Sequence, residues 1–375
     1  MKIAVNTRLL VKNKLDGIGR FSVEILKRMV INNPKIEFHF IFDRPFTSDF
    51  IFSRNIKGHI LSPQTRHPLL WYIWFEIQLP KLIKRINPDL FFSPDGFIST
   101  KITSIPTITT IHDINFEHYP ENMRWTHSIF YRRYFKKYAE LAKHIITVSN
   151  FSKQDLIKTY KLDPSKITSV YNGISDIFSP INTKEKNKIK QRYSDSEDFF
   201  VFIGSLHKRK NIKNLLLAFE IYKTKNGKNK MLIIGEQKWL DASIKTIFEK
   251  MQFKNEIIFL GYLEDNIMSQ VLASATALCF ISLFEGFGLP IIEAMKSKVP
   301  VITSNTSCMP EIADGAALLV NPYSIESIVT ALKTIEENKQ IRKKLIEKGY
   351  ERSKHFDWEK TTNLITQILK KHAKN

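Results

Sequence analysis

Short, almost continuously apolar segments recur along this 375-residue chain, and a segment of helical length follows each of them. They are KIAVN (2–6), EFHFIF (37–42), LFFSP (90–94), TITTIHD (107–113), HIITVS (144–149), ITSVYNG (167–173), FFVFIGS (199–205), KMLIIG (230–235), IIFLG (257–261), ALCFIS (277–282), VPVITS (299–304) and AALLVNP (316–322). Apolar strands separated by helices are typical of parallel sheets that are covered on both faces. Because the pattern occurs twice and the chain is too long for one ordinary core, we predict an α/β protein of two Rossmann-like, doubly wound domains facing a central cleft.

A polar stretch divides the two sets of apolar segments. Residues 175–198 contain Pro180 and a dense run of lysine and arginine, which is typical of a linker with one short helix. The end of the chain reads as a helix, with Asp357 as its N-cap and lysines near its end. The predicted parts are an N-terminal domain over 1–178, a linker over 179–198, a C-terminal domain over 199–356, and a helix over 357–375 that is able to pack back toward the first domain.

The chain carries a formal charge of +20. Such an excess favours a polyanionic partner, which is nucleic acid, an anionic membrane face or a phosphorylated ligand. The only cysteines, Cys279 and Cys308, argue against a disulfide framework and fit a reducing compartment. The sequence has no signal-peptide pattern and no apolar run of ~18 residues, so we expect a cytoplasmic protein without a membrane span.

Two segments combine aromatic with basic residues. Residues 69–85 begin with LLWYIWF and end in Lys81, Lys84 and Arg85, and residues 131–144 read YRRYFKKYAELAKH. Either segment suits an amphipathic helix on an anionic lipid surface. Each equally suits a core helix with a solvated basic face, because amphipathic helices are the usual case in globular proteins. The sequence leaves both interpretations open.

The segment FEGFGLPIIEAM (284–295) follows the end of a predicted strand. Its glycines allow the backbone to approach a ligand closely, and Pro290 suits the first turn of a helix. The N–H groups at such a helix start form an anion site. Glu285 precedes this site and Glu293 lies about one turn beyond it, roughly 5 Å deeper along the helix axis. A sugar nucleotide has the matching layout, with hydroxyls at both ends and a diphosphate between them.

Two other strands are also followed by residues suited to phosphate. Arg209 and Lys210 come after the strand at 199–205, and two cations there suit a diphosphate, although an exposed basic turn has the same sequence. Gly17 and Gly19, in DGIGR, come after the first strand and before a predicted helix. A lone G-x-G is often just a turn, and a dehydrogenase-type G-x-G-x-x-G is absent from the sequence.

Taken in order, these segments resemble glycosyltransferase family 4, whose members are retaining enzymes of the GT-B architecture. The resemblance covers nearly the whole chain. It rests on the E-x7-E arrangement in FEGFGLPIIEAM and on GIGR (17–20), IHD (111–113), VSNFSKQDL (148–156), NGI (172–174), GSLHKRKN (204–211) and SNTSCMPEIADGAALLVNP (304–322). A lone E-x7-E is a weak signal, whereas the ordered set is a strong one.

The resemblance implies a role for each residue that matches the family pattern. Glu293 is expected to bind the ribose of the donor, Glu285 the hydroxyls of the transferred sugar, and His112 to line the sugar site near the reacting carbon. Many relatives have an arginine where this chain has Ser205, directly after the strand glycine. The implied catalytic residues are Glu285, Arg209, Lys210 and His112; the donor-binding residues are Gly17, Gly19, Gly204, Arg209, Lys210, Phe287, Gly288, Leu289 and Glu293; and His112 and Asp113 lie on the acceptor or sugar side.

The resemblance also implies the reaction. We expect a retaining, metal-independent hexosyltransferase without a cofactor, which uses a nucleotide-sugar donor, with GDP-mannose favoured, in cell-surface polysaccharide synthesis. The acceptor is expected to be a glycan, lipid-linked at the inner membrane face, and nucleic acid is not expected as a partner. The alternatives are a UDP-sugar donor carrying glucose, galactose or an N-acetylhexosamine, a non-catalytic sugar-nucleotide-binding protein, and a nucleic-acid-binding protein.

Overall fold

The computed structural model describes residues 1–235 and 242–374, which form two compact units. Unit 1 contains residues 1–173 and the C-terminal segment that begins at Asp357, and unit 2 runs from Ile174 to Phe356. The division therefore lies between Gly173 and Ile174. The predicted linker, 179–198, belongs to unit 2 and contains helix α7 (Thr183–Tyr193). No helix in the described ranges is long and apolar enough to cross a membrane.

Unit 1 is built on a seven-stranded parallel sheet of order β3-β2-β1-β4-β5-β6-β7. Its strands are β1 (Lys2–Asn6), β2 (Glu37–Phe42), β3 (Ile56–Ile60), β4 (Leu90–Ser93), β5 (Thr107–Thr110), β6 (His144–Thr147) and β7 (Ile167–Ser169). The central strand β1 pairs with β2 on one side and with β4 on the other, so that Val5 lies opposite both Phe40 and Phe92. The strands β2 and β3 are thus added on one side of β1, and the strands from β4 to β7 are added on its other side.

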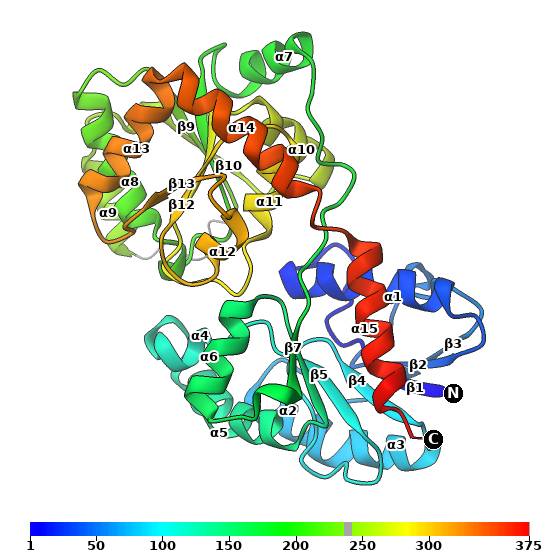
Figure 1. Ribbon diagram of the computed structural model, residues 1–375. Coiled ribbons are helices and arrows are strands. Elements are labelled where there is room, and N and C mark those ends of the chain that lie inside the picture. Colours follow the sequence, from blue (N-terminus) through cyan, green and yellow to red (C-terminus); the bar gives the residue numbers. More distant parts are fainter. Residues whose placement is uncertain (236–241, 375) are drawn as a thin grey trace. The chain divides into compact units, whose positions relative to one another are not determined.

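The helices of unit 1 connect these strands and cover the sheet (Figure 1). They are α1 (Gly17–Asn32), α2 (Pro68–Tyr72), the π-helix η2 (Ile73–Gln78), α3 (Leu79–Ile86), α4 (Asn115–His118), α5 (Trp125–Leu141), α6 (Asn150–Tyr160) and α15 (Trp358–His372), with the short 3₁₀ helices η1 (Ser48–Phe50), η3 (Pro120–Asn122) and η4 (Pro164–Lys166). Helix α15 packs beside α1, and Asp357 caps it by accepting from the N–H groups of Glu359 and Lys360. The C-terminal helix thus completes the first unit rather than the second.

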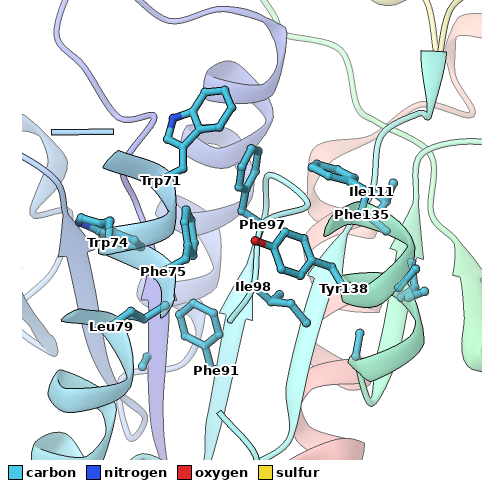
Figure 2. Packing of buried hydrophobic residues seen from close by; sticks show 14 of the residues in the cluster. Trp71, Trp74, Phe75, Leu79, Phe91, Phe97, Ile98, Ile111, Phe135 and Tyr138 are labelled. Atoms are coloured by element: carbon cyan, nitrogen blue, oxygen red, sulfur yellow. The ribbon is translucent and has the colours of Figure 1, made fainter. Parts of the chain in front are cut away.

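Aromatic side chains from α2, η2 and α5 form one buried cluster over the sheet of unit 1 (Figure 2). The ring of Phe97 lies 5.4 Å from that of Trp71 and 5.3 Å from that of Phe75, and it meets the ring of Phe135 edge to face at 5.2 Å. Most of the aromatic residues in the two basic aromatic segments are therefore core residues. The same helices also leave large apolar side chains exposed, among them Leu69 on α2 and Trp125 and Ile129 on α5.

Unit 2 repeats the same architecture on a six-stranded parallel sheet of order β10-β9-β8-β11-β12-β13. Its strands are β8 (Phe199–Ile203), β9 (Lys230–Ile234), β10 (Ile257–Gly261), β11 (Ala277–Phe280), β12 (Val301–Ser304) and β13 (Leu318–Val320). Its further helices are η5 (Lys208–Lys210), α8 (Ile212–Thr224), α9 (Ala242–Lys250), η7 (Lys254–Glu256), α10 (Asp265–Ser274), α11 (Leu289–Lys296), α12 (Met309–Ala313), α13 (Ile325–Glu337) and α14 (Lys339–Ser353). The prediction of two doubly wound α/β domains is confirmed.

Candidate functional site

The candidate site of unit 2 lies at the carboxyl ends of its central strands, β8 and β11. Doubly wound sheets bind ligands at this point, because the connections leave the sheet in opposite directions there. Gly204 follows β8 directly and leads to η5, which carries Arg209 and Lys210. Phe284 and Glu285 follow β11. The backbone N–H of Leu283 donates to the carbonyl of Arg209 at 2.8 Å, which joins the two strand ends.

Glu285 lies between both cations. Its Oε2 is 2.8 Å from Arg209 Nη1 and its Oε1 is 2.7 Å from Lys210 Nζ. Arg209 also donates to the carbonyl of Phe284, and Lys210 lies over the ring of Phe280 at 4.7 Å. The sequence placed Glu285 on the sugar and the two cations on the diphosphate, and the structure brings all three into one buried network.

The charge of Glu285 is stabilised despite its burial. The side chain is only 9% exposed, and burial by itself raises the pKa of a carboxyl group. The charges and hydrogen bonds of Arg209 and Lys210 outweigh burial and lower the pKa of Glu285 to about 2. The carboxylate is therefore ionised at neutral pH. Two cations therefore share this one carboxylate.

Helix α11 begins beside this network. Gly288 has a φ of +95°, a left-handed conformation that favours glycine, and it provides no side-chain cap for the first N–H groups of α11. Pro290 lies in the first turn, as predicted. Leu289 is the first helical residue, and Phe287 packs edge-on against Phe356 at 5.8 Å. The N-terminus of α11 thus lies in the same segment after β11 that carries Glu285.

Glu293 lies in α11, one turn beyond the helix start, and is buried. A buried carboxylate within a largely apolar helix requires polar partners. The structure therefore places one glutamate of the E-x7-E arrangement before the helix start and the other within the helix. This is the layout that the sequence predicts, although the bound ligand that it implies stays a prediction.

The residues predicted in unit 1 lie at the carboxyl ends of β5 and β1. His112 Nε2 is 2.8 Å from the carbonyl of Pro94, so the neutral ring carries its proton on Nε2 and keeps an acceptor at Nδ1. Burial is the main cause of the lowered pKa of His112, which is therefore neutral at pH 7. Asp113 accepts from the N–H of Asn115 at 3.0 Å and begins the turn into α4. That bond gives Asp113 a local structural role.

The two glycines of DGIGR belong to α1. Gly17 is its first residue, and a side chain added there would meet nothing within 4 Å. Asp16 caps the helix, with its carboxylate accepting from the N–H of Gly19 at 2.8 Å. A carboxylate at this helix start competes with a phosphate for the same donor, which makes this a weaker anion site than the start of α11.

Sequence reasoning missed a second polar network, which lies in unit 1. Arg8, after β1, pairs with Asp95, after β4, at 2.6 Å, and both side chains are buried. Polar residues directly after strands were the available signal, but nothing in the sequence links Arg8 in NTRLL with Asp95 in SPD. A hollow of about 820 Å³ lies on α13 and α14 and contains none of the predicted residues. Over residues 1–235 and 242–374, no cluster of His, Cys, Asp and Glu suits a metal ion.

Comparison with known proteins agrees with this geometry. The family model described as Glycosyltransferase Family 4 matches residues 15–176, and the model described as Glycosyl transferases group 1 matches residues 183–352. The chain is 27% identical over 372 residues to O-antigen chain mannosyltransferase B of Escherichia coli, covering 96% of both chains. It is 29% identical over 290 residues to O-antigen chain mannosyltransferase RfbU of Salmonella typhimurium, covering 76% of this chain and 75% of that one.

Solved structures show the same fold at low sequence identity. WaaG, a glycosyltransferase involved in lipopolysaccharide biosynthesis, has a TM-score of 0.76 at 14% identity and covers 98% of this chain and 99% of its own. Anabaena Alr3699/HepE, solved with UDP-glucose, has a TM-score of 0.77 at 18% identity and covers 99% of this chain and 100% of its own. The two family models match the two units in turn, and the chain belongs to the family 4 glycosyltransferases of the GT-B fold.

Proposed function

We propose that the chain is a retaining, metal-independent hexosyltransferase that transfers mannose from GDP-mannose to a glycan in cell-surface polysaccharide synthesis. The observation that carries the proposal is the network of Glu285, Arg209 and Lys210 beside the N-terminus of α11. The two O-antigen mannosyltransferases that the chain resembles support mannose as the sugar, and GDP-mannose is the donor that we favour for it. A UDP-sugar is the alternative, since HepE was solved with UDP-glucose.

Transfer from a nucleotide sugar breaks the bond between the sugar and the diphosphate. Negative charge then builds on the departing phosphate, and preorganised cations stabilise it best. Arg209 and Lys210 are held in place by Glu285 and supply positive charge. The first N–H groups of α11 add a partial positive charge. Glu285 is left to accept from sugar hydroxyls and Glu293 from the ribose.

In this proposal His112 accepts a hydrogen bond and does not act as the general base. Its Nε2–H is engaged by the carbonyl of Pro94, so Nδ1 is the nitrogen that can accept from a hydroxyl of the transferred sugar. The acceptor proton passes to the departing phosphate in a front-face reaction, which retains the configuration at the reacting carbon. The anomeric configuration of the product, read by NMR, tests retention, and turnover in EDTA tests metal independence.

The donor is tested by calorimetric titration with GDP, UDP, ADP and dTDP. We expect GDP to bind most tightly and Glu293→Ala to weaken it by roughly tenfold to 100-fold, the effect of losing charged hydrogen bonds. Glu347→Ala, an exposed acid on α14, is the matched control and should bind like the wild type. A preference for UDP would contradict GDP-mannose, and unchanged binding by Glu293→Ala would contradict the ribose role.

We further propose that the acceptor is lipid-linked and that α5 contacts the cytoplasmic membrane face. Trp125 is 74% exposed and Ile129, one turn along the same helix face, is 57% exposed. Arg133, Lys136 and Lys137 continue the exposed surface of this helix. Exposed aromatic and aliphatic side chains flanked by cations suit the interface of an anionic bilayer.

Vesicle flotation tests the membrane contact. The chain should float with vesicles that contain phosphatidylglycerol and much less with pure phosphatidylcholine. Replacing Arg133, Lys136 and Lys137 by alanine should weaken binding by roughly 100-fold at low salt, since each cation contributes about 1 kcal/mol. The control replaces the exposed Lys343, Lys344 and Lys348 of α14 and removes the same charge. Equal binding by both triple variants would contradict a contact through α5.

A further inference from the structure

A small cavity opens at the carboxyl ends of the strands of unit 1. Its volume is about 130 Å³, and its wall includes Arg8, Lys14, Asp16, Arg44 and Thr65. These residues come from the connections that follow β1, β2 and β3. Three of them are cations and one is an acid, and that acid already caps α1.

Arg8 is fixed from behind by a buried carboxylate. Its Nε donates to Asp95 Oδ2 at 2.6 Å, and Asp95 Oδ1 also accepts from Asn6 Nδ2 at 2.8 Å and from the N–H of Phe97 at 3.2 Å. The guanidinium lies over the ring of Phe97 at 4.2 Å. Arg8 is 7% exposed, so its position is set by packing, by the ring and by the ion pair.

Arg44 is fixed in the same manner. Its Nε and Nη2 donate to the two oxygens of Asp43 at 2.6 and 2.8 Å. Thr65 links the two arginines, because its hydroxyl donates to Asp43 at 2.6 Å and accepts from Arg8 Nη1 at 3.4 Å. Burial raises the pKa of Asp43, but the bonds from Arg44 and Thr65 outweigh it and lower the pKa, so the pair stays ionised.

Both arginines keep donors for a ligand. Within residues 1–235 and 242–374, Arg8 makes hydrogen bonds through Nε and Nη1 and Arg44 through Nε and Nη2. Arg8 Nη2 and Arg44 Nη1 donate to no atom there. The two carboxylates, Asp43 and Asp95, are not part of the cavity wall. The wall thus offers donors from three cations against one acid, Asp16, and the carboxylates of Asp43 and Asp95 lie behind it.

We infer that this cavity binds an acidic group of the acceptor glycan, which is a sugar carboxylate or a phosphate ester. Forked guanidinium donors match the paired oxygens of these anions. A neutral sugar needs acceptors as well as donors, and the wall offers few. The inference rests on the proposed function, because it assigns to the acceptor a site in the unit that does not carry the nucleotide-sugar network. The cavity holds one such group rather than a whole oligosaccharide.

The test uses a reporter that lies directly behind the cavity. The indole N–H of Trp71 donates to the backbone carbonyl of Thr65 at 2.8 Å. The full chain is labelled with ¹⁵N-tryptophan, the Trp71 signal is assigned with Trp71→Phe, and the protein is titrated with glucuronate, glucose 6-phosphate and glucose. We expect the Trp71 signal to shift saturably with one or both acids and not with glucose. A response to glucuronate alone identifies a carboxylate, and a response to the phosphate alone identifies a phosphate ester.

Arg44→Gln should weaken this response by roughly tenfold or more, the cost of a charged hydrogen bond. The control is Arg28→Gln on α1, since Arg28 also pairs with a carboxylate and is 27% exposed against 23% for Arg44. If Arg44→Gln does not fold, Lys14→Gln on the exposed loop gives the same comparison with a smaller effect. No shift with either acid, an equal shift with glucose, or unchanged binding by the cavity variants would overturn the inference. GDP binding, measured separately, shows whether the proposed function fails with it.

Discussion

The two units place the same kind of ion pair at the same point of the same topology. Strand orders β3-β2-β1-β4-β5-β6 and β10-β9-β8-β11-β12-β13 are equivalent, with β1 matching β8 and β4 matching β11. In unit 1 a cation after β1, Arg8, meets a carboxylate after β4, Asp95. In unit 2 the cations after β8, Arg209 and Lys210, meet a carboxylate after β11, Glu285.

The difference between the two networks lies in their balance of charge. Asp95 has one cationic partner and accepts further bonds from Asn6, Ser93 and Phe97, so it is fully neutralised and fully bonded. Glu285 instead has two cationic partners. We therefore expect the ion pair of Arg8 with Asp95 to matter most for stability, and the cations of unit 2 to matter most for the reaction. The following predictions break or sharpen this comparison.

The largest effect on stability should come from Asp95. Asp95→Ala leaves Arg8 buried without its anion and removes the acceptor of several hydrogen bonds. We expect a loss of about 3–5 kcal/mol in the free energy of unfolding. Urea denaturation followed by tryptophan fluorescence measures it, because Trp71, Trp74, Trp125 and Trp358 all belong to unit 1. A loss under about 1 kcal/mol, the usual size for an exposed pair, would show that the network of unit 1 is no support.

Lys210→Ala should have the opposite effect, with a large loss of turnover and little loss in the free energy of unfolding. Glu285 keeps Arg209 as its partner, so the fold loses little, whereas the charge on the departing phosphate loses a cation. We expect turnover to fall roughly 100-fold to 1000-fold, as when one donor to a developing anion is removed. Lys213→Ala, an exposed lysine on α8, is the control. Turnover that matches the control would remove Lys210 from the catalytic residues.

The loss of stability of unit 2 at acidic pH should depend on Glu285. Its pKa is about 2 in the folded protein against 4.5 normally, so its contribution is complete above about pH 4.5 and is lost as the pH falls toward 2. The difference corresponds to about 3 kcal/mol in the free energy of unfolding. Glu285→Gln should flatten this part of the stability curve without changing its slope between about pH 5 and 8. An unchanged acid limb would show that Glu285 is not the group that titrates.

Sequence reasoning was strongest where the pattern is local. Alternating apolar segments predicted both sheets, although β3 was missed because its sequence, IKGHI, lies at a sheet edge and is largely polar or exposed. Strand ends pointed to Glu285, Arg209 and Lys210. Their pairing was not predictable, since it joins residues more than 70 positions apart and depends on the order of strands in the sheet. The partnership of Arg8 with Asp95 was hidden for the same reason.

The smallest expected effect concerns His112, and it decides how the two units share the chemistry. Burial lowers the pKa of His112, and the carboxylates of Asp113, Asp95 and Asp16 oppose burial without reversing it. The ring is therefore already neutral below its usual pKa of about 6.5. If it only accepts a hydrogen bond, turnover should change less than about twofold between pH 6.5 and 8, and His112→Gln should keep the same profile at a lower rate. A general base with an ordinary pKa would instead lose activity toward pH 6 and lose that dependence in the variant. That outcome would move the proton transfer into unit 1, and a flat profile would leave the charge chemistry with Arg209 and Lys210 in unit 2.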